Sequence, residues 1–396
     1  MKFTIIGITD SPTPHFSPEV LAAIHQGKVF SGGKRHHEIV ASLLPEGAEW
    51  IDIVAPLDAT LSQYHGHVVV FASGDPLFYG FANTLRRKMP DAEIELHPTF
   101  NSLQMLAHRL LLPYHDMHIV SLTGRPWDEF DRALIERRQK IGILTDRVHT
   151  PPAIASRMLE YGYTGYTMHV GEHLGNPSCE KVSSMPAEEA VDREFSHPNC
   201  IILYTPQAKP RSFGIPDSEF ALLDGRGKMI TKMPIRLLTL QALGLAHKHV
   251  FWDIGFCTGS VSIEARMQFP HLHIEAFEIR RECEAIINEN TRRMGAPGIN
   301  IHIGDFLDTD TSHLPHPDAI FIGGHGGRLA EIMAKACEAL TDGGCMVLNS
   351  VKAPLVKTDS RQMFANACEA LGLQQLPPTR ILLNDNHPIE ILTCRK

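Results

Sequence analysis

The sequence predicts an α/β protein built from two domains that are joined by a linker. Short apolar runs alternate with helical stretches in the first half, and strands and helices alternate regularly in the second. Between these regions, residues 206–230 are rich in proline and glycine and poor in apolar side chains, which is typical of a linker. The length of 396 residues suits two domains. We therefore expect one domain over 1–207, a linker over 208–230 and a second domain over 231–396.

The first domain is expected to begin with a strand and a well-marked helix. Residues 2–8 form an apolar run that is typical of a buried strand. Ser17 is placed to cap a helix whose first turn holds Pro18 and Glu19, and Gly27 is expected to end it. Further strands are expected near 28–31, 50–53, 67–72, 167–170 and 200–204, and further helices near 78–88, 102–111, 127–137 and 151–161.

The second domain is predicted to be a doubly wound, Rossmann-like sheet with helices between its strands. A helix is expected over 231–245. Strands are expected near 249–254, 273–278, 299–303, 318–322 and 344–349. Ligands of such folds bind at the carboxyl ends of the strands, so the residues that follow each strand are the first candidates for a site.

Composition disfavours several classes of function. An apolar fraction of 43% and a charged fraction of 21% are typical of a globular protein. The net charge of −8 disfavours a nucleic-acid partner, and no apolar run is long enough to span a bilayer, so we also expect no membrane partner. The 8 cysteines include no Cys-x-x-Cys pair, and the 23 histidines match no zinc-ligand spacing. The cysteines favour a reducing cytoplasmic location without disulfides, and the histidine spacings disfavour a metal site.

A glycine-rich turn in the second domain indicates a ligand site. Asp253 ends a predicted strand, and Gly255 and Gly259 let the backbone that follows approach a ligand closely. Glu278 ends the next strand, where its carboxylate is placed to accept hydrogen bonds from ribose hydroxyls. The turn therefore predicts a site for a ligand that contains a nucleoside.

The same segment argues against a nicotinamide-dependent dehydrogenase. The dinucleotide fingerprint would need glycine at 257 and 260, where this chain has Cys257 and Ser260. Asp305 and Phe306 follow the third strand, where an adenine ring could be flanked, and Gly323 ends the fourth. A glycine turn without a ligand is the alternative, but four strand ends with suitable residues favour a site.

The linker and the second domain resemble the precorrin-6Y methyltransferase (decarboxylating) family of cobalamin biosynthesis. Besides the strand ends, the matching segments are Gly214-Ile215-Pro216-Asp217, Gly227-Lys228-Met229-Ile230-Thr231-Lys232 and Gly323-Gly324-His325-Gly326-Gly327-Arg328. The resemblance implies an S-adenosylmethionine (SAM)-dependent domain that methylates carbon 15 and removes the ring-C acetate carboxylate. The implied SAM contacts are Thr231, Asp253, Gly255, Phe256, Cys257, Thr258, Gly259, Glu278, Asp305 and Phe306.

The first domain resembles the tetrapyrrole methylase fold, in which SAM lies folded between two α/β lobes. The matching segments are Ser73-Gly74-Asp75-Pro76-Leu77-Phe78-Tyr79-Gly80, Pro98-Thr99-Phe100-Asn101-Ser102 and Ser121-Leu122-x-Gly124-Arg125. They resemble the carbon-5 methylating domain of the same pathway. The implied SAM contacts are Ser73, Gly74, Asp75, Pro76, Phe78 and Ser102, so that each domain is expected to bind one SAM.

Four positions depart from the pattern of these families. Cys257 stands where glycine is usual, and a positive φ there would cost cysteine roughly 1–2 kcal/mol. Thr9, Thr99 and Asn101 stand where glycine, glycine and serine are common. We expect Cys257 to weaken SAM binding in the second domain slightly. We expect the other three departures to tighten the SAM loop of the first domain without removing that site.

The resemblance implies a tetrapyrrole substrate that bears acetate and propionate carboxylates, and an enzyme that forms a homo-oligomer. Candidates to hold those carboxylates are Arg236, His325, Arg328 and Lys352 in the second domain and Arg35 and Arg125 in the first. The sequence leaves open whether the substrate carries cobalt and whether methylation precedes decarboxylation. Two alternatives remain at this stage: a tetrapyrrole methylase fused to a methyltransferase with another substrate, and a SAM- or tetrapyrrole-binding protein with one or both sites inactive.

Overall fold

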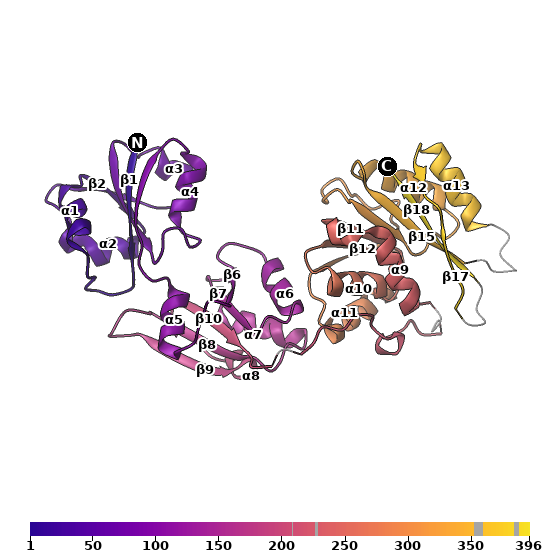
Figure 1. Ribbon diagram of the computed structural model, residues 1–396, viewed down its shortest axis with the longest axis horizontal. Helices are drawn as coiled ribbons and strands as arrows, with labels where there is room; N and C mark the ends of the chain where they lie inside the picture. Colours follow the sequence, from indigo (N-terminus) through magenta and orange to yellow (C-terminus); the bar gives the residue numbers. More distant parts are fainter. Residues whose placement is uncertain (208, 226–228, 352–358, 384–387) are drawn as a thin grey trace. The chain divides into compact units, whose positions relative to one another are not determined.

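The chain folds into two compact units that each have their own sheets (Figure 1). This computed structural model describes residues 1–207, 209–225, 229–351, 359–383 and 388–396. The first unit comprises Met1–Pro126, Gln139–Arg157 and Thr164–Gln207, and the second comprises Trp127–Arg138, Met158–Tyr163 and Ala208–Lys396. The segments Trp127–Arg138 and Met158–Tyr163 therefore group with the second unit, although they precede residue 207. The sequence predicted a single boundary at that residue and did not predict this grouping.

The first unit opens with a five-stranded parallel sheet in the order β3-β2-β4-β1-β5. Its strands are β1 (Lys2–Ile8), β2 (Val29–Gly32), β3 (Glu49–Asp52), β4 (His67–Ser73) and β5 (Glu93–His97). Its helices are α1 (Pro18–Gln26), α2 (Lys34–Val40), α3 (Leu57–Leu61) and α4 (Phe81–Lys88). Ser17 caps α1 by accepting from the backbone N–H of Val20, as the sequence predicts. Strands β1 and β4 are central and buried, so their carboxyl ends meet in the middle of this lobe.

A second five-stranded sheet, in the order β6-β7-β10-β8-β9, completes the first unit. Its strands are β6 (His118–Ser121), β7 (Lys140–Leu144), β8 (Thr167–Glu172), β9 (Lys181–Pro186) and β10 (Asn199–Tyr204). Helix α5 (Ser102–Leu110) packs Leu103 and Leu106 against Cys200 and Ile202 of β10. Helices α6 (Asp128–Ile135), α7 (Pro151–Glu160) and α8 (Ala187–Ala190) lie between these strands in the sequence. Of them, α6 and the last residues of α7 group with the second unit. The two sheets confirm the two-lobed architecture that the resemblance implies.

The second unit is one sheet in the order β13-β12-β11-β14-β15-β18-β16, with β17 paired to β18. The five strands from β13 to β15 are parallel, and β18 is antiparallel to β15. The strands are β11 (Val250–Ile254), β12 (His273–Glu278), β13 (Ile299–Ile303), β14 (Ala319–Ile322), β15 (Cys345–Val351), β16 (Gln374–Gln375), β17 (Thr379–Ile381) and β18 (Ile389–Arg395). The helices are α9 (Met233–Leu243), α10 (Ser260–Gln268), α11 (Glu282–Met294), α12 (Leu329–Ala339) and α13 (Ser360–Ala370).

Both faces of this third sheet are buried. Neighbouring residues of β11 point to opposite faces, so Phe251 packs in one apolar cluster with Leu240 of α9, and Trp252 packs in another with Met333 of α12. Helices thus cover the sheet on two sides, which is the doubly wound arrangement that the sequence predicts. The antiparallel β16–β18 region after α13 was not predicted, because its strands are short and only β18 carries a marked apolar run.

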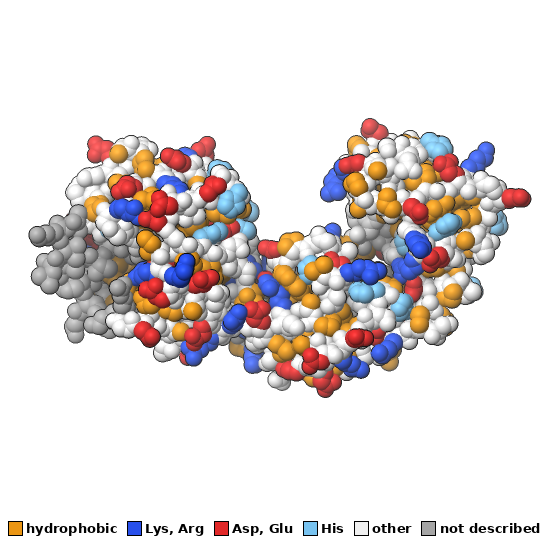
Figure 2. Space-filling view, turned by 180° about the vertical axis from the view of Figure 1, so that it is seen from behind, with side chains coloured by type: hydrophobic (Ala, Val, Ile, Leu, Met, Phe, Trp, Pro, Cys, Tyr) orange, Lys and Arg blue, Asp and Glu red, His pale blue; other side chains and the backbone are white. Residues whose placement is uncertain are grey.

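Charges of both signs are distributed over the surface. On the face that Figure 2 shows, Lys and Arg side chains are interspersed with Asp and Glu side chains. Arg361 and Glu390 form one surface ion pair, with their charged atoms 3.3 Å apart. Among the described residues, no helix is both long enough and apolar enough to span a membrane.

The predicted linker is folded onto the second unit by a buried ion pair. Arg236 of α9 and Glu264 of α10 are both fully buried, with Nε and Oε2 3.1 Å apart. The Glu264 carboxylate accepts the backbone N–H groups of Gly214 and Ile215 at 3.2 and 2.9 Å. The Arg236 guanidinium donates to the carbonyl oxygens of Ile215 and, at 2.8 Å, Thr231. Gly214, Ile215 and Thr231 are therefore fastened to the second unit through this pair.

Replacing Arg236 with alanine is expected to destabilise the second unit by about 3–5 kcal/mol, because Glu264 would stay buried without its partner. The matched control is Arg361→Ala, which breaks an exposed pair and should cost less than about 1 kcal/mol. Differential scanning calorimetry of the full chain measures both. Equal, small shifts in Tm for the two variants would contradict the structural role of Arg236.

Candidate functional site

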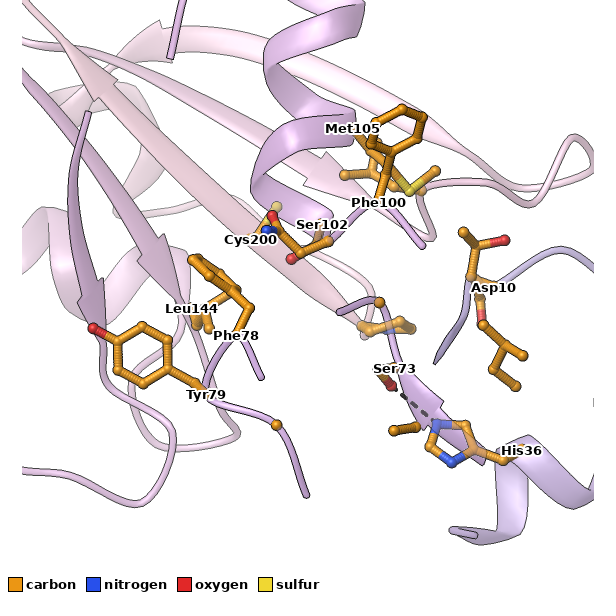
Figure 3. Close-up of a pocket in the computed structure, with 18 of the residues that line it drawn as sticks. Asp10, His36, Ser73, Phe78, Tyr79, Phe100, Ser102, Met105, Leu144 and Cys200 are labelled. Carbon is orange, nitrogen blue, oxygen red and sulfur yellow. Dashed lines mark hydrogen bonds between the residues drawn. The ribbon is translucent and has the colours of Figure 1, made fainter. Parts of the chain in front are cut away.

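The first candidate site is a cavity of about 420 Å³ in the first unit. It lies at the carboxyl ends of β1 and β4 and at the start of α5, and both lobes contribute residues (Figure 3). Four of the six predicted SAM contacts of this domain line it: Ser73, Gly74, Phe78 and Ser102. Tyr79 and Phe100, which stand in the matching segments without having been named as contacts, also line it, and sequence analysis missed Met105, Asn199 and Cys200. Asn199 and Cys200 begin the predicted strand near 200–204, but nothing in the sequence showed that this strand starts beside β4.

Ser73 is the centre of a polar cluster at the rim of this cavity. Its hydroxyl accepts from Nη2 of Arg35 at 3.0 Å and lies 2.9 Å from Nε2 of His36 (Figure 3). Burial, assisted by the neighbouring Arg35 charge, lowers the pKa of His36 to about 4, so this imidazole is neutral at neutral pH. Arg35 also pairs with Asp10 at 2.8 Å. The candidate carboxylate holder Arg35 is thus already engaged by a carboxylate of the chain.

Asp75 and Pro76 shape the loop after β4 instead of lining the cavity. Asp75 Oδ1 accepts the backbone N–H of Leu77 at 2.8 Å, which forms a tight turn. A Cβ at Gly80 would come 2.4 Å from the carbonyl oxygen of Pro76, so the turn requires glycine there. This turn occupies residues 74–80, so helix α4 begins at Phe81 and not near residue 78 as predicted.

The departures in the first domain have local structural explanations. Asn101 caps α5, since its Oδ1 accepts the backbone N–H of Gln104 at 2.9 Å. In turn, Oε1 of Gln104 accepts the backbone N–H of Asn101 at 3.0 Å. Asparagine performs this capping as well as serine does. The hydroxyl of Thr9 accepts the backbone N–H of Ser11 at 3.3 Å. Nothing in the structure explains Thr99.

One group of possible metal ligands occurs among the described residues, although none was predicted. Asp10, His173 and Cys179 place one ligand atom each within 4.8 Å of one another. The Asp10 carboxylate is engaged by Arg35 and, at 3.0 Å, by Nδ1 of His173. Two of the three groups, Asp10 and His173, are therefore engaged with each other and with Arg35.

The second candidate site lies at the carboxyl ends of the central strands of the second unit. Asp253 is fully buried at the end of β11, and its Oδ2 accepts from the N–H and the hydroxyl of Ser262 at 3.1 and 2.5 Å. Burial raises the pKa of Asp253 to about 7. Its Oδ1 has no hydrogen-bond partner among the described residues. The methionine ammonium group of SAM would satisfy this oxygen, so the residue fits the implied ligand.

Glu278 ends β12 beside Asp253, as predicted. Its Oε2 accepts the backbone N–H of Cys257 at 2.9 Å, which fixes the glycine-rich turn. Arg280 covers the same carboxylate, with its Nε 2.9 Å from Oε1 and its Nη2 3.1 Å from Oε2. A ribose at this carboxylate would have to share it with Arg280 or displace it.

Cys257 adopts a left-handed backbone conformation, with φ of 53°. The position therefore has the geometry that favours glycine, and cysteine costs roughly 1–2 kcal/mol there. The thiol is buried, points to the carbonyl oxygen of Met229 at 3.4 Å and packs with Phe256 and Ile287. Burial raises the pKa of this thiol, which disfavours a reactive thiolate.

The remaining predicted contacts of the second domain are divided between the strand ends and the core. Thr258, whose hydroxyl lacks a partner among the described residues, and Gly259 continue the turn before α10. Phe306 is buried in the core, with its ring 5.1 Å from that of Phe277, so it offers little surface to an adenine ring. Asp305 is bound by Arg328, which lowers the pKa of Asp305.

The candidate carboxylate holders of the second domain differ in exposure. Arg236 is fully buried and bonded to Glu264, which contradicts the expectation that it contacts a substrate carboxylate. Arg328 is exposed, and His325 is half-buried with a pKa lowered by burial. Lys352 lies outside the described residues.

The first unit is a two-lobed α/β domain with a cavity beside its strand ends, and the second is a doubly wound domain with an acidic, glycine-rich strand end. This combination is that of a two-domain methyltransferase. Residues 2–191 match the family described as tetrapyrrole (corrin/porphyrin) methylases, and residues 223–380 match the precorrin methyltransferase domain. A Sinorhizobium protein named precorrin-6Y C(5,15)-methyltransferase (decarboxylating) is 33% identical over 353 residues, which cover 88% of this chain and 84% of that protein. The chain belongs to the precorrin-6Y C(5,15)-methyltransferase (decarboxylating) family.

Two shorter relatives each match about half of the chain. A cobalt-precorrin-6B C(15)-methyltransferase (decarboxylating) of Salmonella typhi is 33% identical over 184 residues, covering 44% of this chain and 93% of that protein. A cobalt-precorrin-7 C(5)-methyltransferase of Salmonella typhimurium is 28% identical over 204 residues, covering 50% of this chain and 98% of that protein. The two activities in these names occur together in the name of the longer Sinorhizobium relative.

The raised pKa of Asp253 predicts that SAM binds the second unit more tightly as pH rises from about 6 to about 7.5. Below its pKa the carboxyl group is neutral and cannot pair with the ammonium group, whereas above it the carboxylate can. Isothermal titration calorimetry with S-adenosylhomocysteine should show this pH dependence in the wild type and lose it in Asp253→Asn. The account is wrong if the asparagine variant keeps the same dependence.

Proposed function

We propose that this chain transfers methyl groups from SAM to carbons 5 and 15 of precorrin-6Y, or of its cobalt form, and removes the ring-C acetate carboxylate. The observation that carries this proposal is the presence, in one chain, of a cavity at the β1 and β4 strand ends and of a buried acidic strand end at Asp253. The relatives named for C(5) and C(15) methylation support the assignment of one reaction to each half.

In the second unit, Asp253 holds the ammonium group of SAM and Glu278 holds its ribose. The turn from Gly255 to Gly259, in which Glu278 accepts the N–H of Cys257, would hold the ligand between these two carboxylates. SAM supplies the methyl group as part of a sulfonium, which is already activated for transfer. The residues of the chain therefore orient the reacting carbon and exclude water, and no general base is required at the strand end.

In the first unit, Ser73, Gly74, Phe78 and Ser102, which line the cavity, would hold a second SAM. Phe78 packs with Leu144 on the same apolar cluster as α5, which keeps this side of the cavity dry (Figure 3). Neutral His36 and the Arg35–Asp10 pair fix the hydroxyl of Ser73 at the rim. One SAM thus binds in each domain.

Decarboxylation in the second unit needs no further cofactor. The conjugated macrocycle accepts the electron pair that remains when carbon dioxide leaves, and the resulting electron-rich system is a partner for methylation at carbon 15. His325 and Arg328, at the glycine-rich loop after β14, are the residues that we propose to hold substrate carboxylates, with Arg328 exchanging its partner Asp305 for the substrate. The enzyme acts in the cytoplasm as a homo-oligomer.

The mass of the product tests this function. Incubation of the full chain with precorrin-6Y and excess SAM is expected to add two methyl groups and remove one carbon dioxide, as mass spectrometry can measure. The variant Glu278→Gln should weaken ribose binding, so we expect it to add the carbon-5 methyl group while slowing decarboxylation and carbon-15 methylation roughly tenfold. SAM binding without any change in precorrin mass would instead identify a binding protein.

A further inference from the structure

A second cavity, of about 340 Å³, adjoins the SAM cavity of the first unit. The loop residues Phe78, Tyr79 and Gly80 line both cavities, so the two lie on either side of this loop. The second cavity is completed by Asn83 and Arg87 of α4 and by Arg125, which follows β6. Arg125 is one of the candidate carboxylate holders from the sequence, whereas neither Arg87 nor this cavity has a role assigned so far.

The charge of this second cavity is positive, although the whole chain carries a net charge of −8. Both of its charged lining residues are arginines, and none of the described residues that line it is Asp or Glu. Arg87 is exposed in the last turn of α4 and has no hydrogen bond or ion pair with any described residue. By contrast, Arg35 at the SAM cavity is already paired with Asp10. Among the described arginines that line the two cavities, Arg87 and Arg125 are therefore the ones that no carboxylate of the chain engages.

Arg125 is held in place with part of its guanidinium unused. Its Nη1 donates to the hydroxyl of Ser121 at 2.5 Å and to the carbonyl oxygen of Thr123 at 3.3 Å. Its guanidinium carbon lies 5.2 Å from the centre of the Tyr79 ring, which supports it by a cation–π contact. Nε and Nη2 donate to no described residue and are available to a ligand.

Tyr79 itself adopts a left-handed backbone conformation, with φ of 54°. Bulky residues rarely adopt this conformation, and such strain concentrates where a ligand is held. The consequence here is that the Tyr79 side chain lies beneath Arg125 at the border of the two cavities. Figure 3 shows that Tyr79 and Phe78 come from the same loop, so one segment contacts both cavities.

We propose that Arg87 and Arg125 form a carboxylate-binding subsite that holds an acetate or propionate side chain of the tetrapyrrole while the macrocycle reaches the SAM cavity. This proposal rests on the proposed function for the class of ligand. Guanidinium groups bind carboxylates with paired hydrogen bonds, and two of them at one cavity suit a substrate with several carboxylates. The preformed position of Arg125 reduces the conformational entropy lost on binding.

Binding of uroporphyrin, a fluorescent tetrapyrrole with acetate and propionate side chains, tests the subsite directly. Fluorescence titration of the full chain is expected to give a Kd roughly tenfold higher for Arg87→Ala and for Arg125→Ala than for the wild type. The matched control is Arg86→Ala, which removes an exposed arginine from the same helix but outside the cavity, and it should leave Kd within about twofold. Arg87→Lys should restore part of the affinity, because it keeps the charge but loses the paired geometry.

The subsite is refuted if wild-type protein does not bind uroporphyrin, if Arg87→Ala binds it as wild type does, or if Arg86→Ala weakens binding equally. Affinity for S-adenosylhomocysteine, measured in the same variants, should not change, and a parallel loss would indicate damage to the fold. The proposed function fails separately: absence of methyl transfer to precorrin-6Y, with charge-dependent uroporphyrin binding intact, would refute the reaction and leave the subsite standing.

Discussion

Both candidate sites depend on the close approach of backbone segments at strand ends, where only glycine fits. In the first unit, a Cβ at Gly7 would come 2.0 Å from the carbonyl oxygen of Gly74, so the ends of β1 and β4 can converge only without side chains there. In the second unit, a Cβ at Gly255 would come 2.7 Å from the backbone nitrogen of Gly324, which joins the ends of β11 and β14 in the same way. Side chains that carry chemistry then surround these contacts: Ser73 in one unit and Asp253 in the other.

A carboxylate covered by an arginine recurs beside both sites. Asp10 is paired with Arg35 at the first cavity, and Glu278 is paired with Arg280 at the end of β12. Such pairs keep a buried or half-buried carboxylate satisfied when no ligand is bound, which limits the cost of its desolvation. They also mean that ligand binding exchanges one set of hydrogen bonds for another. Asp253 differs, since burial raises its pKa and leaves one oxygen without a described partner.

The sequence predicted the framework of the fold because that framework depends on local patterns. Apolar runs marked β1 and β4, Ser17 marked the start of α1, and the spacing from Asp253 to Glu278 marked two neighbouring strand ends. What sequence reasoning missed depends on contacts between distant residues. The motif that contains Arg236 predicted a contact between this arginine and the substrate. Because Arg236 is instead paired with Glu264 on another helix, its role is to stabilise the fold. In the same way, Phe306 follows a strand as expected, yet its ring belongs to the core around Trp252.

The central claim is that one chain carries two separate SAM sites, one in each unit. Isothermal titration of the full chain with S-adenosylhomocysteine measures this most directly. The account predicts two molecules bound per chain in the wild type, with substitutions at Asp253 affecting one binding event and leaving the other unchanged. A single molecule bound per chain, or the loss of all binding on substitution of Asp253 in a folded protein, would contradict it.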